Sequence, residues 1–458
     1  MNIGLIGLGS MGYNLAKNLI SKDFTVHAFE KNDKIIEKIA SEKITKLHLE
    51  SSLKELCNKT PSPRIIMLSL PADKIDQCID ELTEYLNPND IIADLGNSLY
   101  LKSIERYRRL SDQNIDFLGV GVSGGPRGAK LGPAIMSGGS QDAWNKTKHI
   151  FNSIAAKDNN DTACCYFGSA GAGHFVKLIH NGIEYALMES LAEISCVLKN
   201  AFNMDQENQV NALKKILNTE TSSFLLEITS KVLNAKNDAD QYFIDQIDNE
   251  IGQNGTGTWT INAALELGVS IPSIYSAVST RSSSYDFNYK KKEILSNNKK
   301  PLLDFNDINL EEIVFFNFAC SLYQGLTLIE ASNKWDYFDF KLKDIFKAWS
   351  AGCILQGKYL KFMYTEYNQK NELDLNFLYN IINKKTSENL LSIRKFNAAA
   401  INLAIPSPVL SANLAYYDLM FSEHKIGETI QLQRSFFGLH PLKEKETNKV
   451  LKPYWTKL

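Results

Sequence analysis

Along the first half of the chain, short apolar runs alternate with stretches of helical periodicity. The runs that read best as buried strands are Ile3–Ile6, Thr25–Phe29, Arg64–Leu68, Ile91–Asp94 and Phe117–Val122. Between them, apolar residues recur three and four positions apart in Asn14–Ile20, Ile75–Leu86 and Leu101–Leu110, as in crossover helices. The alternation predicts an α/β domain with a doubly wound parallel sheet, which ends between residues 155 and 175.

From His174 onward, long helical patterns broken by polar loops replace the strand pattern and predict an all-α region. The segment Ser282–Lys300 is rich in Ser, Asn and Lys and is interpreted as a surface connection between helices. From Pro441 to Leu458 the chain is charged and contains two prolines, so we expect an extended tail there.

The composition indicates a protein with several folded domains and argues against nucleic-acid and membrane partners. With 458 residues, 44% hydrophobic and 22% charged, the chain is longer than one core usually serves and is expected to fold throughout. Its net charge of −2 gives no global attraction to nucleic acid or to an anionic membrane. No basic leader precedes the first apolar run and no apolar stretch reads as long enough to span a bilayer, so we expect a cytoplasmic protein without nucleic-acid or membrane partners.

Seven cysteines, with Cys164 and Cys165 adjacent, form no C-x-x-C pattern and are too sparse for a disulfide scaffold. We expect most of them to be small core residues in a reducing compartment. No metal ligand set is recognised in the sequence.

A glycine motif, Gly7-Leu8-Gly9-Ser10-Met11-Gly12, follows the first predicted strand and opens a predicted helix. Glycines are needed there because side chains would keep a pyrophosphate away from the free N–H groups at the helix N-terminus. The motif predicts a dinucleotide site in a Rossmann-type domain, against the alternative of a turn that only packs the helix on the strand. Glu30, after the second strand, would bind the adenosine ribose diol and favours NAD, whereas Lys31 is placed to reach a 2′-phosphate, which leaves the choice open.

A second candidate site lies in the stretch from His174 to Tyr185. Read as a helix, it places Lys177, His180, Asn181 and Glu184 on one face, at i, i+3, i+4 and i+7. An amine, an imidazole, an amide and a carboxylate on one stripe are suited to acid–base catalysis. The alternative is an exposed polar stripe with a Lys/Glu pair, while Val176, Ile179 and Ile183 form the apolar face that buries the helix.

Two glycine-containing segments follow predicted strands at the edge where open α/β sheets bind ligands. Asp94-Leu95-Gly96-Asn97-Ser98 follows one strand, and Val122-Ser123-Gly124-Gly125 follows the next. The second offers a hydroxyl and bare backbone N–H groups to a carboxylate. Either segment is also compatible with a simple tight turn.

The chain resembles the 6-phosphogluconate dehydrogenase family, oxidative decarboxylases of the pentose phosphate pathway and of gluconate utilization. Besides the segments above, the resemblance rests on Gly255-Thr256-Gly257 with Trp259-Thr260, Ala264-Leu265-Glu266-Leu267-Gly268, Ile405-Pro406-Ser407-Pro408, and Gln433-Arg434 with Phe437-Gly438 and His440. It implies a Rossmann-type NAD(P)-binding domain over residues 1–174, an all-helical substrate and dimerisation domain over 175–432, and a tail over 433–458 that reaches the partner subunit of a homodimer. Shorter β-hydroxyacid dehydrogenases resemble only the first two-thirds.

By this resemblance, Lys177 is the base that removes the C3 hydroxyl proton as hydride leaves C3, and its ammonium then polarises the ketone during loss of CO₂ without a metal. Glu184 is the acid that protonates C1. The implied substrate-binding residues are Asn97, Ser123, Gly124, Gly125, His180, Asn181, Tyr185, Thr256, Arg281, Arg434 and His440. The implied cofactor-binding residues are Gly7, Gly9, Ser10, Met11, Gly12, Glu30, Lys31, Asn32, Leu70 and Asn97.

The chain departs from the family pattern at both phosphate sites. Asn254 and Thr258 stand where the family usually carries lysines, and Leu70 replaces a usual lysine in the nucleotide half. Glu30-Lys31-Asn32 replaces a motif that usually offers arginine and threonine to a 2′-phosphate. Two other readings therefore stay open: a dehydrogenase for another 3-hydroxy acid, and a non-catalytic, ligand-sensing relative.

Overall fold

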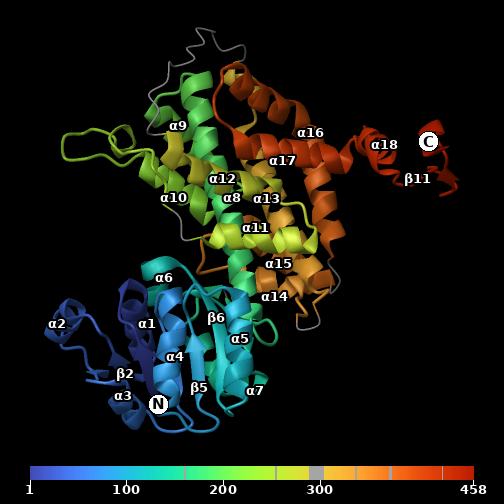
Figure 1. Ribbon diagram of the computed structural model, residues 1–458. Helices are drawn as coiled ribbons and strands as arrows, with labels where there is room; N and C mark the ends of the chain where they lie inside the picture. The colour runs from blue at the N-terminus through green and yellow to red at the C-terminus, as the bar shows by residue number, and fades with distance from the viewer. Residues whose placement is uncertain are drawn as a thin grey trace.

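The computed structural model describes residues 1–458 except 159–160, 253–254, 288–303, 336–337, 371–373, 425 and 458. A sheet-containing domain is followed by a mostly helical one, and the long helix α8 (Ala172–Ala201) runs from the first into the centre of the second (Figure 1). The fold is therefore a Rossmann-like domain joined to a large helical domain.

The N-terminal domain is built on an eight-stranded sheet in the order β10-β7-β6-β5-β4-β1-β2-β3. Its strands are β1 (Asn2–Ile6), β2 (Thr25–Phe29), β3 (Leu47–Leu49), β4 (Ile65–Leu68), β5 (Ile91–Asp94), β6 (Asp116–Ser123), β7 (Ala134–Gly139) and β10 (Cys164–Tyr166). Helices α1 (Ser10–Ser21), α2 (Asp33–Ser41), α3 (Leu53–Lys59), α4 (Ile75–Thr83), α5 (Tyr100–Ser111), α6 (Gly125–Leu131) and α7 (Gln141–Ile154) connect and cover them. The five strands and three crossover helices expected from the pattern are confirmed to within a few residues at their ends.

One strand breaks the expected parallel order. Strand β7 pairs antiparallel with β6, and the other neighbouring strands of the sheet pair in parallel. The five predicted strands pair in parallel as expected, and the departure is at β7, a strand that was not predicted. The connection from β6 to β7 contains only the seven-residue helix α6, whereas a crossover to a parallel strand needs a longer connection.

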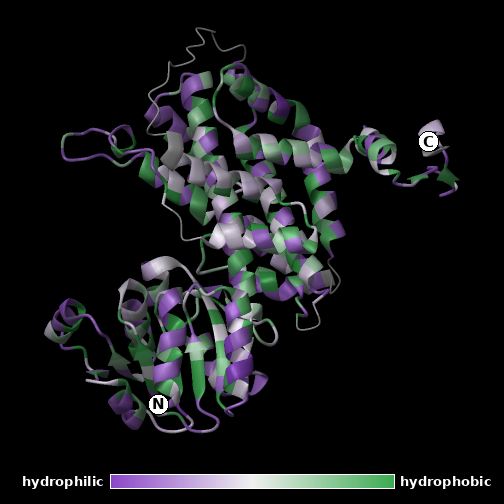
Figure 2. Cartoon of the chain, in the orientation of Figure 1, coloured by the Kyte–Doolittle hydropathy of each residue, from purple (hydrophilic) through white to green (hydrophobic). Residues whose placement is uncertain are grey.

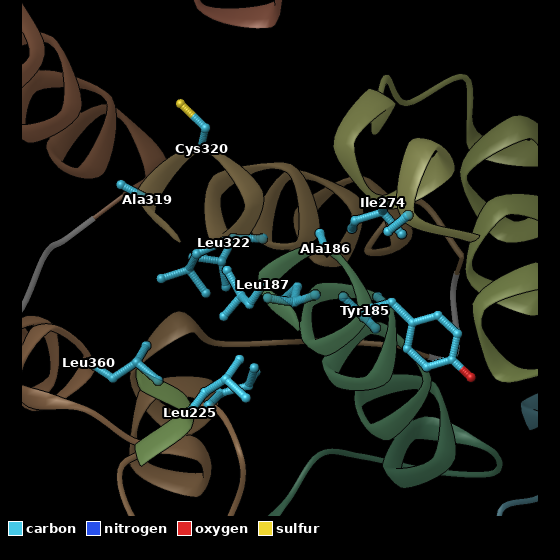
Figure 3. Packing of buried hydrophobic residues seen from close by; sticks show 14 of the residues in the cluster. Tyr185, Ala186, Leu187, Leu225, Ile274, Ala319, Cys320, Leu322 and Leu360 are labelled. Atoms are coloured by element: carbon cyan, nitrogen blue, oxygen red, sulfur yellow. The ribbon is translucent and has the colours of Figure 1, made fainter. Parts of the chain in front are cut away.

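The second domain consists of helices packed around α8 and α13. They are α9 (Gln206–Ile216), α10 (Phe224–Leu233), α11 (Thr256–Leu267), α12 (Pro272–Phe287), α13 (Leu310–Ser332), α14 (Leu342–Trp349), α15 (Lys358–Lys370), α16 (Leu375–Asn402) and α17 (Pro408–Phe421). In Figure 3, Ala186 and Leu187 of α8 lie close to Leu322 of α13. Because α8 contributes to this core along most of its length, its polar face is held rigidly against the sheet domain.

Helix α13 corrects one expectation. Among the described residues, it is long and apolar enough to cross a membrane by length and composition, although no such stretch was recognised in the sequence. Most of its apolar window, 78%, is buried inside the protein, where α13 packs against α8 and α16. A core helix of this kind passes the same test, so the finding gives only weak support to a membrane span.

Two expected irregular segments are partly ordered. Helix α12 continues to Phe287, so the start of the Ser282–Lys300 segment is helical, and its remainder from 288 lies outside the described residues. Serine is tolerated there because Ser282 Oγ donates to the Val278 carbonyl at 3.1 Å. The tail of residues 433–458 begins inside helix α18 (Gly427–Gly438), and the stretch from Pro441 that was predicted to be extended contains a small hairpin, β11 (Leu442–Lys443) and β12 (Val450–Leu451).

The tail stands apart from the rest of the helical domain (Figure 1). Hydrophobic positions recur along it in Figure 2, although little of the chain covers them. Ile430, Phe436, Phe437 and Leu439 are all more than half exposed. The tail therefore has almost no core of its own.

All seven cysteines are free thiols, as expected, and all but the partly buried Cys196 are buried.

Candidate active site

The glycine motif forms a tight turn between β1 and α1. Gly7 has φ +89°, and a Cβ on it would lie 2.4 Å from the Ser69 carbonyl oxygen, while a Cβ on Gly12 would lie 2.0 Å from the Gly7 carbonyl oxygen. A Cβ on Gly9 would meet no atom within 4 Å, and Gly9 caps α1 without a side-chain hydrogen bond. Gly7 and Gly12 thus allow the tight turn, and Gly9 leaves open space beside the N–H groups at the start of α1. This arrangement fits a pyrophosphate. Ser10 and Met11 begin α1 at this point.

Glu30 lies directly beside this turn and is held by the backbone. Its Oε2 accepts from the Leu8 N–H at 2.7 Å, and its Oε1 accepts from the Lys31 N–H at 2.9 Å and the Asn32 N–H at 3.0 Å. Asn32 itself caps α2, where its Oδ1 accepts from the Lys34 N–H. The carboxylate therefore occupies the backbone donors that an anionic ligand would otherwise use.

A cavity of about 410 Å³ opens next to Glu30. Gly7, Lys31 and Leu70 contribute to its lining, as does Glu81 of α4. Lys31 Nζ lies 3.3 Å from the Glu81 carboxylate, so its charge is already paired. The cavity has the position and size for the adenosine end of a dinucleotide, and its wall is apolar at Leu70.

The polar face of α8 is buried rather than exposed. Lys177 and Asn181 are each 8% exposed and His180 is fully buried. Lys177 Nζ donates to Asn181 Oδ1 at 2.7 Å and lies 3.5 Å from His180 Nδ1, and Glu184 Oε2 is 3.8 Å from the same imidazole nitrogen. The four residues therefore form one cluster. The alternative interpretation, a polar stripe exposed to solvent, is wrong for Lys177, His180 and Asn181.

Burial shifts the pKa of each titratable member of this cluster. It lowers the pKa of the Lys177 ammonium from its usual value, an effect that the Glu184 carboxylate partly opposes. It raises the pKa of Glu184, which Lys177 and Arg281 partly oppose. Burial, reinforced by Lys177, holds the pKa of His180 well below its usual range. A lysine biased toward the neutral base beside a carboxyl biased toward the neutral acid is an arrangement suited to proton transfer.

The turn after β6 lies against this cluster. Ser123 Oγ is 3.3 Å from His180 Nε2, and Gly124 and Gly125 have φ of +121° and +59°. Strand β6 also approaches α8 closely, because a Cβ on Gly121 would lie 2.4 Å from Lys177 Cβ. The structure thus brings the predicted carboxylate turn and the predicted base together.

A buried ion network fixes the loop that carries Asn97. Arg106 Nη1 donates to Asp94 Oδ2 at 2.9 Å, and its remaining donors bind Asp76. Asp94 in turn accepts from the Gly96 N–H and the Ser98 hydroxyl. Asn97, which is exposed, projects from a loop braced on both sides.

The predicted phosphate end contains a buried arginine. The Arg281 guanidinium lies 3.6 Å from the centre of the Tyr185 ring, and its buried Nε has no hydrogen-bond partner among the residues that the structure describes. Thr256 is buried in the first turn of α11, whereas Thr258 is exposed. Asn254 lies outside the described residues. An orphaned guanidinium donor beside the α8 cluster suits a phosphate ligand.

The two predicted tail residues lie away from the α8 cluster of their own chain. Arg434 and His440 are exposed on the projecting tail, away from α8 (Figure 1).

Two residues near the site gave no signal in the sequence reading. His174, in the first turn of α8, is buried with its Nδ1 2.6 Å from Ser103 Oγ, and the sequence pattern assigns it no role. Trp349 packs edge-to-face on His180, with ring centres 5.8 Å apart. Nothing in the local pattern around Trp349 indicates this contact, since it depends on the tertiary fold.

A Rossmann-like domain whose sheet edge meets a cluster of buried Lys, His and Asn with a partly buried Glu defines a nicotinamide-dependent dehydrogenase. Residues 2–169 match the NAD binding domain of 6-phosphogluconate dehydrogenase, and residues 173–455 match its C-terminal domain. The chain belongs to the 6-phosphogluconate dehydrogenase family.

Similar proteins support this over the whole length. Decarboxylating 6-phosphogluconate dehydrogenases from Caenorhabditis elegans and Salmonella typhimurium are each 34% identical, covering 96% and 99% of this chain and 93% and 98% of their own. The Plasmodium falciparum 6-phosphogluconate dehydrogenase, solved apo, with its cofactor NADP⁺ and with its substrate 6-phosphogluconate, superposes with a TM-score of 0.90 at 30% identity over 99% of this chain and 100% of its own.

Proposed function

We infer that this chain catalyses the oxidative decarboxylation of 6-phospho-D-gluconate to D-ribulose 5-phosphate and CO₂, with reduction of a nicotinamide cofactor. The observation that carries the inference is the buried Lys177 with the partly buried Glu184 on α8, in a cluster whose His180 contacts Ser123 of the Ser123-Gly124-Gly125 turn. Family membership adds the reaction class, and the orphaned Arg281 donor favours a phosphorylated substrate.

In this mechanism Ser123, Gly124 and Gly125 hold the substrate carboxylate, and His180 with Asn181 orients the hydroxyl at C3. The neutral Lys177 amine takes the C3 hydroxyl proton, and the bound nicotinamide supplies the hydride acceptor. The resulting Lys177 ammonium then donates a hydrogen bond to the C3 ketone oxygen and stabilises the charge that develops as CO₂ leaves. Protonated Glu184 delivers a proton to C1, which is consistent with its raised pKa on burial.

The test is turnover by the purified protein with 6-phosphogluconate and NAD or NADP. We expect absorbance of the reduced cofactor to rise as CO₂ is released, and Lys177→Ala to abolish both. Reduction without CO₂ would favour a dehydrogenase for another 3-hydroxy acid, and no signal with either cofactor would favour a non-catalytic relative. Equal efficiency with unphosphorylated gluconate would contradict the phosphate site at Arg281 and Tyr185.

We propose NAD as the preferred cofactor. A 2′-phosphate would bring about two negative charges to the Glu30 carboxylate, which already takes three backbone N–H donors, while Lys31 is paired with Glu81. The adenosine diol of NAD carries no such charge and can donate to Glu30. We expect kcat/KM for NAD to exceed that for NADP by at least about tenfold, a difference of about 1.4 kcal/mol.

The matched variants are Glu30→Asn, which removes the carboxylate, and Glu37→Gln, which removes an exposed carboxylate from α2. Glu30→Asn should raise the NADP/NAD efficiency ratio by about tenfold or more, and Glu37→Gln should leave the ratio unchanged. A wild-type preference for NADP would refute the proposal.

We also propose a cytoplasmic homodimer in which the tail of each subunit packs on the other. The exposed apolar side chains of α18, among them Phe436 and Phe437, support this, because an uncovered apolar segment of this size is unfavourable in water. The free thiols fit a reducing compartment. Light scattering should give the mass of a dimer for the full chain and of a monomer after deletion of residues 427–458.

A further inference from the structure

The connection between α14 and α15 reaches across the domain boundary. Figure 1 places α14 at the base of the helical domain, next to the sheet domain, and α14 packs on β7 and β10. Immediately after α14, the Gly352 carbonyl oxygen accepts from the Ala134 N–H at 3.1 Å, at the start of β7. A segment of the substrate domain is thereby hydrogen-bonded to the sheet of the cofactor domain.

The same carbonyl lies on the carboxylate turn. A Cβ built on Gly124 would lie 2.5 Å from the Gly352 oxygen, so the two backbones are as close as a glycine allows. Gly352 itself has φ +69°, and its N–H donates to Gln356 Oε1 at 2.8 Å. The Gln356 side chain therefore closes a small loop that holds the Gly352 carbonyl against Gly124.

At the other end of the segment, Trp349 reaches the catalytic cluster. Its indole is fully buried, stands edge-to-face on the His180 ring, and points its Nε1–H at Met136 Sδ 3.4 Å away on β7. His180 also contacts Ser123 through Nε2 and Lys177 through Nδ1. The imidazole is thus fixed between α8, the carboxylate turn and Trp349.

We propose that Trp349 and the Gln356-braced Gly352 carbonyl are positioning groups for the substrate-carboxylate site: Trp349 sets the plane of the His180 ring, and Gly352 sets the Gly124 backbone. Neither touches the reacting atoms. The proposal rests on the proposed function, because it assigns a role within that same site. It requires that loosening either group raises KM for the sugar acid and lowers kcat while cofactor binding is retained, since the glycine motif of α1 lies on a different part of the sheet edge.

Two pairs of variants separate positioning from folding. Trp349→Leu removes the ring that faces His180, and Trp349→Phe keeps an aromatic edge there without the N–H. Gln356→Ala removes the oxygen that accepts from Gly352, and Gln356→Glu keeps an acceptor oxygen. Trp144→Phe is the matched control, because Trp144 is a partly buried indole on α7 that stacks on Phe151 and Tyr166, away from the cluster.

The measurements are KM for 6-phosphogluconate, KM for the cofactor, kcat and the melting temperature. We expect Trp349→Leu and Gln356→Ala to raise the substrate KM by about tenfold and to lower kcat by at least about tenfold, with the cofactor KM within about twofold of wild type. Trp349→Phe and Gln356→Glu should recover most of the loss, and Trp144→Phe should show none.

Lower melting temperatures with unchanged substrate KM and kcat would make the segment structural only and overturn the inference. If Trp349→Leu does not fold, the variants Gln356→Ala and Gln356→Glu test the proposal by the same comparison of substrate KM and kcat with melting temperature. Wild-type protein that fails to oxidise 6-phosphogluconate would refute the proposed function instead, so the two failures are distinguishable.

Discussion

Lys177 can lie against strand β6 only because residue 121 has no side chain. A Cβ on Gly121 would lie 2.4 Å from Lys177 Cβ and 3.1 Å from the Gly173 carbonyl oxygen. Real Cβ atoms do not approach so closely, and neither neighbour is the free end of a flexible side chain. An alanine here must push the first turns of α8 away from the sheet.

We therefore expect Gly121→Ala to lower kcat by about 10- to 100-fold, because a displacement of about 1 Å at a catalytic group has effects of that size. Cofactor affinity, measured by fluorescence titration, should change by less than about twofold. Gly252→Ala is the control, since a Cβ there meets no atom within 4 Å. Wild-type kcat in Gly121→Ala would show that the contact does not set the lysine position.

At the scale of single residues, the sequence was informative where function follows local spacing. The i, i+3, i+4, i+7 pattern placed Lys177, His180, Asn181 and Glu184 on one face, and the structure gathers them in one cluster. The burial of that face was not readable, because it comes from β6 and from Trp349. Such contacts depend on chain segments far apart in sequence, which no local pattern encodes.

At the scale of elements, one buried carboxylate joins two long helices. Glu193 of α8 is 4% exposed, and its oxygens accept from the Val409 and Leu410 N–H groups at the start of α17, at 2.8 and 2.9 Å. Burial raises the pKa of Glu193 to about 8, although the two N–H donors oppose this. The group therefore titrates higher in the folded protein than in the unfolded chain.

The sign of the pH dependence follows from that difference. Below the ordinary glutamate pKa, Glu193 is protonated in both the folded and the unfolded chain, and its contribution to the free energy of unfolding is fully present. That contribution is lost as pH rises through about 8. We expect Glu193→Gln, which cannot titrate, to lose less stability than wild type between about pH 5 and about pH 9, by a few kcal/mol at most. Melting temperatures across this range provide the measurement, with the surface variant Glu227→Gln as control. Parallel curves for wild type and Glu193→Gln would refute the expectation.

Elements with a strong period were predictable, and short or mixed ones were not. Strands β1, β2, β4, β5 and β6 are nearly continuous apolar runs, which is what a sheet covered on both faces demands. Strand β3 has only three residues, and β7 ends in two glycines, so neither carries a recognisable pattern. Because β7 itself was not predicted, its antiparallel pairing with β6 was not predicted either.

At the scale of the whole molecule, the order of the two domains was readable from the change in periodicity near His174, where α8 begins at Ala172. The tail was not readable in the same way. Its helix α18 buries Ser435 and leaves large apolar side chains exposed, which is the basis for the proposal that it packs on a partner subunit. A single chain contains no pattern that identifies such a surface.

If the chain forms the proposed homodimer, mixed dimers can show in which subunit the tail acts. The experiment uses Lys177→Ala and Arg434→Ala, both of which we expect to be inactive, and lets their subunits exchange. If the tail serves the partner's site, a mixed dimer has one site with both Lys177 and Arg434 intact, because the Arg434→Ala subunit supplies the lysine and its partner supplies the arginine. Random exchange of equal amounts then restores about a quarter of wild-type activity, since about half of the dimers are mixed and each has one working site.

If the tail serves its own subunit, every site in the mixture lacks one of the two groups and no activity returns. The readout is the rate of cofactor reduction before and after exchange, with each variant alone as the baseline. Refolding from denaturant is the exchange method of choice, because the exposed apolar residues of α18 favour a dimer that dissociates slowly. A control exchange between wild type and Lys177→Ala should leave total activity unchanged, which confirms that the procedure itself neither creates nor destroys sites.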